Sequence, residues 1–192
     1  MKTMKAIRER RSIRRYKEEP IPEDVLTEIL NAGRLAPSGK NAQPWRFVVV
    51  QDDEKRAEMV KVMREGIDAR QAEGIPPGSS RWTAKVMEQA PVTVFVFNEN
   101  AGVLAVPNDV GDTFDCLVNA QSIGAAIQNM LLAATELGVG SLWICDVFYA
   151  YVELSKWLGE NHQMIAAVSL GFADVAPYAR ARKPLNDLVR HL

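Results

Sequence analysis

Hydrophobic residues follow two different spacings along this chain, and the spacing separates predicted helices from predicted strands. Apolar residues recur at the period of an amphipathic helix in residues 22–35, 52–71 and 151–158. Short β-branched or aromatic runs predict buried strands instead, and they cover residues 45–50, 91–97, 141–147 and 164–172. The order is helix, helix, strand, helix, strand, long helix, strand, helix, strand, which predicts an α+β or mixed α/β fold.

The longest helical pattern, residues 109–137, carries apolar side chains on nearly every side. A helix of this kind is buried inside its domain, so we expect a long buried central helix. Its apolar positions are Phe114, Leu117, Val118, Ile123, Ile127, Met130, Leu131 and Leu132. Gly138 is expected to end it in the left-handed conformation, and residues 72–80 contain the turn residues of a long loop.

The composition is that of a globular domain and excludes several classes of protein. Hydrophobic residues make up 47% and charged residues 24% of the 192 residues, which argues against a disordered chain, a coiled coil and a fibre. Because there is no linker, repeat or low-complexity tract, we expect residues 1–192 to form a single domain. A formal net charge of -1 gives no general attraction for nucleic acid.

No run approaches the ~20 apolar residues of a membrane span, and the start of the chain lacks the apolar core of a secretory signal. We therefore expect a cytoplasmic protein with neither a membrane nor a nucleic acid as partner. His162 and His191 are the only histidines, and neither has a cysteine or carboxylate cluster at ligand spacing, so we expect no metal centre.

A basic cluster near the start of the chain is the first candidate for chemistry. Arg10, Arg11, Ser12 and Arg14 stand within five residues, and further basic residues flank them. The arginine fork suits phosphate oxygens through charge-assisted, often bidentate hydrogen bonds, and the serine hydroxyl adds a donor. A solvated basic turn of helix, or a polybasic arm for nucleic acid or membrane, is the alternative for this cluster.

A polar turn between a predicted helix and a predicted strand is the second candidate. It contains Pro37, Ser38 and Gly39, followed by Asn41 and Gln43. Free backbone N–H groups, the serine hydroxyl and two side-chain amides suit a planar or anionic ligand. A helix stop followed by an ordinary polar loop is the alternative. If the turn and the basic cluster converge, together they suggest a flavin site.

Four blocks in this order resemble the nitroreductase family of flavoproteins. They are residues 10–16 (RRSIRRY), residues 36–47 (APSGKNAQPWRF), residues 119–134 (NAQSIGAAIQNMLLAA) leading into 137–141, and residues 170–172 (LGF) followed by the basic segment 180–184. The resemblance implies a nitroreductase-like fold with a central mixed, mainly antiparallel β-sheet flanked by helices. It also implies a homodimer with one FMN in each of two clefts between the subunits.

The resemblance also assigns roles to residues of this chain. The phosphate and the pyrimidine edge of the flavin would be held by Arg10, Arg11, Ser12 and Arg14. From the other end of the chain, the phosphate site would be closed by Arg182 with its neighbour Lys183. The segment beside the isoalloxazine ring would contain Gly140 and Ser141. The partner subunit would contribute the turn of Pro37, Ser38 and Gly39, with Asn41 or Gln43 nearby.

The implied activity is a ping-pong oxidoreductase reaction. NADH or NADPH would give hydride to the flavin N5 and leave, and a nitroaromatic, quinone or enone would take its place. No side chain need act as an acid or base, so no catalytic residue is assigned. The alternatives are a reductive dehalogenase, a flavin-fragmenting enzyme, an enoyl or peptide dehydrogenase, and a non-catalytic flavin-binding protein.

One feature of larger family members has no clear counterpart in this sequence. They carry an asparagine from the middle of the chain to the flavin edge, and either the Trp82 region or Lys85 stands in the corresponding segment here. The expected cover over the flavin is short, at about residues 71–82.

Overall fold

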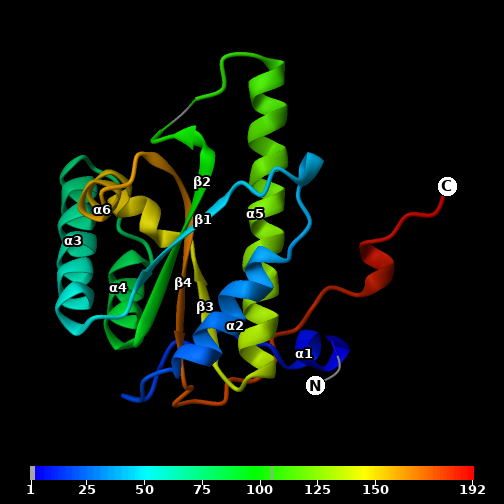
Figure 1. Cartoon of the computed structure of the whole chain (residues 1–192), viewed down its shortest axis with the longest axis horizontal. Coiled ribbons are helices and arrows are strands. Elements are labelled where there is room, and N and C mark those ends of the chain that lie inside the picture. Colours follow the sequence, from blue (N-terminus) through cyan, green and yellow to red (C-terminus); the bar gives the residue numbers. More distant parts are fainter. Residues whose placement is uncertain (1–2, 105) are drawn as a thin grey trace.

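The computed structural model describes residues 3–104 and 106–192, and its centre is a four-stranded sheet (Figure 1). The sheet order is β1-β2-β4-β3. The strands are β1 (Trp45–Val50), β2 (Val92–Gly102), β3 (Gly140–Ile144) and β4 (His162–Gly171). All three strand pairings are antiparallel, and a parallel bridge joins Ser12 to Ser141 beside β3. The predicted mixed, mainly antiparallel sheet is confirmed.

Helices cover both faces of this sheet, as Figure 1 shows. One face is covered by α2 (Glu23–Arg34) and α5 (Val110–Glu136). The other is covered by α3 (Asp53–Ala72), α4 (Ser80–Gln89) and α6 (Tyr151–Leu158). Alternate residues of β2 enter the two cores: Val94 and Val96 pack towards α2 and α5, whereas Phe95 packs towards α3 and α4. Burial on both faces explains the unbroken apolar run in this strand.

Most of the predicted elements are confirmed, with differences at their ends. The predicted helices 22–35, 52–71 and 151–158 are α2, α3 and α6. The strand predicted for residues 141–147 ends at Ile144, and the short 3-10 helix η2 (Asp146–Ala150) follows. Val147 is completely buried in the core beneath α3, so its apolar character reflects packing and not pairing in the sheet.

The helix α4 was missed by the sequence pattern. Its buried side chains are Ser80, Thr83, Ala84, Val86 and Met87, a helical stripe confined to ten residues. The predicted loop over residues 72–80 is limited to the connection between α3 and α4. Of the segment expected to cover the flavin, residues 71–82, only residues 73–79 are a loop, because Gln71 belongs to α3 and Trp82 to α4.

The long helix α5 is buried along its second half, where Ile123, Ile127 and Met130 are inaccessible to solvent. In its first half, however, Phe114 is 61% exposed and Leu117 is 57% exposed. Figure 1 shows this half extending beyond the rest of the body. The apolar pattern of α5 therefore continues past the core of the single chain. Gly138 follows with φ +77°, so its predicted left-handed conformation is confirmed.

The N-terminal helix and the beginning of the C-terminal tail lie near one another. The N-terminal helix α1 (Thr3–Glu9) and the first part of the C-terminal tail border one cavity, and the tail then leaves the body (Figure 1). The tail contains one short 3-10 helix, η3 (Leu185–Asp187). Among the helices of the described residues, none is both long and apolar enough to span a bilayer.

Candidate functional site

Arginines from both ends of the chain surround a cavity of about 360 Å³ between α1 and the C-terminal tail. Six of them line it: Arg8, Arg10, Arg11, Arg14, Arg180 and Arg182. Ser12 lies on the same wall, and Ile7 and residues 177–179 complete the lining. Among these described lining residues none is acidic. The structure thus brings together five predicted site residues: Arg10, Arg11, Ser12, Arg14 and Arg182.

The segment that follows α1 is fixed by hydrogen bonds to the edge of the sheet. The Ile13 N–H donates to the Ser141 carbonyl at 2.9 Å, and the Lys17 N–H donates to the Phe172 carbonyl at 2.9 Å. The Ile13 side chain is buried in the core, and the Tyr16 hydroxyl donates to the Ile13 carbonyl at 2.9 Å. These contacts set the segment along β3 and leave its polar side chains at the cavity.

The electrostatics of the cavity are those of an uncompensated cationic site. Partial burial, followed by the positive charges of Arg182 and Arg11, lowers the pKa of Arg10. Arg11 donates to the backbone carbonyls of Arg8 at 2.6 Å and Arg10 at 2.9 Å. Arg182 donates to the carbonyl of Arg180 at 3.2 Å. Since these partners are carbonyls and not carboxylates, the cluster is suited to an anion of more than one charge.

A second cavity of about 340 Å³ adjoins the first, and both are lined by Arg11 and Pro177. Gly140 and Ser141 line this second cavity. Ser141 is only 2% exposed, and its hydroxyl oxygen has no hydrogen-bond partner among the described residues. A buried hydroxyl usually has such a partner, which makes Ser141 an unusual buried group.

Gly140 has a packing requirement of its own. A Cβ atom there would lie 2.9 Å from Ile13 Cγ1 and 3.0 Å from the Gly171 carbonyl oxygen. The contact between the 10–17 segment and β3 therefore requires glycine at this position, whatever the cavity holds.

Trp82 and Lys85, the two candidates for the place of the asparagine of larger family members, both lie on α4. The Arg14 guanidinium carbon lies 5.7 Å from the centroid of the Trp82 ring, within the range of a cation–π contact. Lys85 is exposed, and neither Lys85 nor Trp82 lines either cavity. Of the two, Trp82 is the residue that contacts the arginine cluster.

The polar turn lies apart from the arginines. It forms the short 3-10 helix η1 (Gly39–Asn41), and the Gly39 N–H donates to the Ser122 hydroxyl of α5 at 3.3 Å. Ser38 accepts a hydrogen bond from the Gln43 N–H at 2.9 Å, while the Asn41 and Gln43 side chains are exposed. Pro37 and the other predicted residues of the turn line neither cavity, and the same holds for exposed Lys183. One chain does not bring the two predicted segments together.

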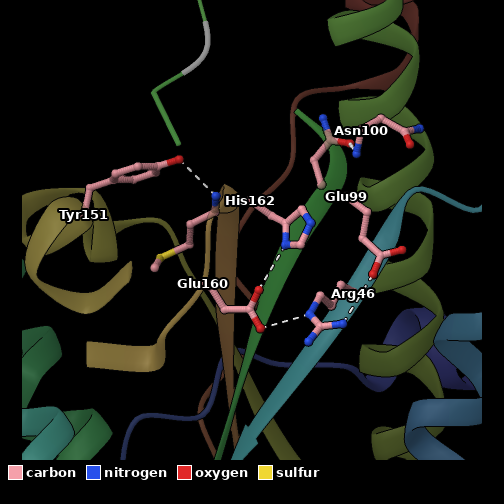
Figure 2. Close-up of polar contacts among 8 residues, drawn as sticks. Arg46, Glu99, Asn100, Tyr151, Glu160 and His162 are labelled. Atoms are coloured by element: carbon pink, nitrogen blue, oxygen red, sulfur yellow. Dashed lines mark hydrogen bonds and ion pairs between the residues drawn. The ribbon is translucent and has the colours of Figure 1, made fainter. Parts of the chain in front are cut away.

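A polar cluster at the opposite end of the sheet was not identified from the sequence (Figure 2). Glu160, only 9% exposed, accepts hydrogen bonds from Arg46 Nε at 2.9 Å and from His162 Nδ1 at 3.0 Å. Burial raises the pKa of Glu160, but the hydrogen bonds from His162 and Arg46 and their charges outweigh it, so the pKa is lowered overall. Glu99 contacts Arg46 from β2 at 3.5 Å. The cluster joins β1, β2 and β4 and has the character of a structural network.

The comparisons with known proteins agree with the fold, which is that of an α+β protein with a four-stranded antiparallel sheet. The Nitroreductase family model matches residues 7–172. This chain belongs to the nitroreductase family.

Two curated relatives and one solved structure show the range of the family. YfhC of Bacillus subtilis, whose name assigns it provisionally to the NAD(P)H nitroreductases, is 26% identical over 94% of this chain and 89% of its own. An iodotyrosine deiodinase of Thermotoga neapolitana is 28% identical over 70% of this chain and 69% of its own. A nitroreductase-type structure from Desulfovibrio desulfuricans, in complex with FMN, is 29% identical, with a TM-score of 0.76 over 100% of this chain and 97% of its own.

Proposed function

We propose that this protein binds FMN and acts as an NAD(P)H-dependent oxidoreductase. The observation that carries the proposal is the cavity in which six arginines from both ends of the chain meet without an acidic residue in the described lining. A phosphate monoester bears close to two negative charges at neutral pH and offers three acceptor oxygens. Such a group suits the fixed, paired guanidinium donors of this cavity.

The remaining residues fit the rest of FMN. Arg10, Arg11, Ser12 and Arg182 would hold the phosphate, with Lys183 next to them in the tail. Arg14 would donate to the pyrimidine edge. The flavin ring would lie between Arg14 and the segment of Gly140 and Ser141, where the Ser141 hydroxyl lacks a partner among the described residues.

We propose a homodimer, in which the polar turn of the second subunit completes the site. Two features of the chain support this arrangement. The turn packs on the first half of α5 and not beside the arginines, and the same half of α5 exposes Phe114 and Leu117. In this arrangement the contribution from the second subunit would be Pro37, Ser38 and Gly39, with Asn41 or Gln43.

Bound in this site, FMN would supply hydride transfer between NADH or NADPH and an electron-poor acceptor such as a nitroaromatic or a quinone. The side chains of this protein bind and orient the cofactor, and we assign none of them as an acid or base. We further propose that residues 1–192 work as one domain in the cytoplasm.

A second candidate is a reductive dehalogenase. The iodotyrosine deiodinase from Thermotoga neapolitana, 28% identical over 70% of this chain, favours it among the specialised activities. It shares the cofactor proposal and differs only in the acceptor.

The test is anaerobic mixing of the FMN-loaded protein with NADH or NADPH, followed by addition of nitro, quinone or iodinated aromatic acceptors. Loss of the oxidised flavin absorbance and its return on adding a nitroaromatic or quinone would support the oxidoreductase. Return with the iodinated acceptor alone would support the dehalogenase. Bound flavin that neither nicotinamide reduces would contradict both and indicate a non-catalytic flavoprotein.

A further inference from the structure

Trp82 of α4 lies over Arg14, one of the arginines of the cationic cavity. The Arg14 guanidinium carbon is 5.7 Å from the Trp82 ring centroid, and the indole itself remains 50% exposed. The two residues belong to different parts of the chain, and α4 has no counterpart in the sequence pattern. The pair is therefore visible only in the folded structure.

Arg14 is held without a carboxylate among the described residues. Its Nη1 donates to the Ser12 carbonyl at 3.2 Å, and its other contact is the Trp82 ring. A guanidinium that rests against an aromatic ring is attracted to the π electrons and keeps its in-plane N–H donors available. A carboxylate partner would occupy those donors and cancel the charge. Trp82 can thus restrain Arg14 while leaving it free to donate to a ligand.

The position of Trp82 is fixed by the contact of α4 with η2, which follows β3. Asp146, two residues after β3, accepts hydrogen bonds from Ser79 at 2.8 Å and from Thr83 at 2.5 Å. Thr83 is itself buried next to Trp82 in the chain. On the outer side of the same turn, Arg81 forms an ion pair with Asp68 of α3 at 2.5 Å. The first turn of α4 is therefore held against η2, the 3-10 helix that follows β3.

We propose that Trp82 is a positioning residue that holds the Arg14 guanidinium for hydrogen bonding to the pyrimidine edge of the flavin. The inference rests on the proposed FMN site and adds a residue to it. Trp82 acts on the ring half of the ligand through Arg14, whereas the phosphate half is held by the other arginines. Its removal therefore lowers the affinity for riboflavin and for FMN by the same factor, and leaves the affinity for inorganic phosphate unchanged.

The experiment measures the dissociation constants of FMN, riboflavin and inorganic phosphate for apoprotein of the full chain. An exposed cation–π contact corresponds to roughly a two- to five-fold change in affinity. Trp82→Leu should weaken FMN and riboflavin binding by about that factor, and Trp82→Phe, which keeps an aromatic face, by less. Trp157→Leu is the matched control, because Trp157 lies on α6 with its indole N–H donating to Glu58, away from both cavities.

A second experiment repeats Trp82→Leu in an Arg14→Ala background. It distinguishes an effect of Trp82 through Arg14 from a direct contact between Trp82 and the flavin. There the tryptophan has nothing to position, so the second substitution should cause no further loss. The proposal is overturned if the loss is as large in that background, if phosphate affinity falls along with FMN affinity, or if Trp82→Leu binds FMN like the wild type. If the wild type itself binds no flavin, the proposed function fails, which is a distinct outcome.

Discussion

Arg10 and Arg182 come from opposite ends of the chain and face the same cavity, close enough that the charge of Arg182, after partial burial, contributes to lowering the pKa of Arg10. Folding therefore brings like charges together at a cost. Such an arrangement is characteristic of functional sites, where a ligand of opposite charge removes the cost.

The first prediction concerns this pair. Arg10→Ala and Arg182→Ala should each weaken FMN binding by roughly 10- to 100-fold, because a hydrogen bond to a charged group contributes about 1.5–3 kcal/mol. Apoprotein stability should stay the same or rise, since repulsion is removed. Fluorescence titration with FMN and urea unfolding measure the two effects. The control is Arg64→Ala, whose exposed arginine pairs with Glu88 away from the cavity.

Ser141 allows a test of the second cavity. Its hydroxyl is buried without a hydrogen-bond partner among the described residues, so Ser141→Ala should leave the apoprotein as stable as the wild type or slightly more stable. If the flavin is the partner, the same variant should bind FMN several-fold more weakly, by about 1 kcal/mol. Unchanged FMN affinity would remove Ser141 from the site.

A substitution at Gly140, unlike one at Ser141, should lower the stability of the apoprotein. An added Cβ would meet Ile13 Cγ1 at 2.9 Å and the Gly171 carbonyl at 3.0 Å, so Gly140→Ala should destabilise the apoprotein by about 1–3 kcal/mol in urea unfolding. Gly124→Ala is the matched control, since its Cβ would have no neighbour nearer than 3.8 Å and a helical alanine is favoured over glycine. A Gly140→Ala protein as stable as the wild type would show that the close contact with Ile13 is absent in solution.

The Glu160 network predicts a pH dependence of stability. Because the pKa of Glu160 is lowered in the folded state, its stabilisation is fully present above the pKa of the unfolded chain and is lost as the pH falls through the folded value. Glu160→Gln should lower the free energy of unfolding by about 1 kcal/mol at neutral pH. The effect is modest because Arg46 is largely exposed. The variant should also lose less stability than the wild type as the pH falls.

The control for this network is Glu99→Gln. Glu99 lies 3.5 Å from the same Arg46 but is exposed, so its substitution should alter stability little. Equal acid sensitivity of the wild type and the Glu160→Gln variant would contradict the role given to Glu160.

The elements that could be predicted from the sequence are those with a clear hydrophobic periodicity or a continuous apolar run. The doubly buried β2 and the helices α2, α3 and α6 belong to this group. The helix α4 was missed because its buried stripe of Thr83, Ala84, Val86 and Met87 is short and directly follows a loop rich in glycine and proline. The extent of burial along α5 could not be predicted, because an apolar pattern does not say whether the chain itself or another molecule covers it.

The candidate site could be predicted where local sequence determines chemistry. The cluster of Arg10, Arg11, Ser12 and Arg14 is contiguous, and the structure adds Arg182 from the tail to it, as expected. The contact of Trp82 with Arg14 could not be predicted, since it depends on how α4 packs against η2. The Glu160 cluster was missed for a similar reason: strand pairing in the sheet brings Arg46 to it.

The central claim, that this chain is an FMN protein, is tested most directly by titrating the purified apoprotein with FMN and determining the stoichiometry of the bound flavin. We predict a yellow protein that holds one FMN per chain and releases it on denaturation. A folded protein that stays colourless and takes up no FMN would contradict the claim.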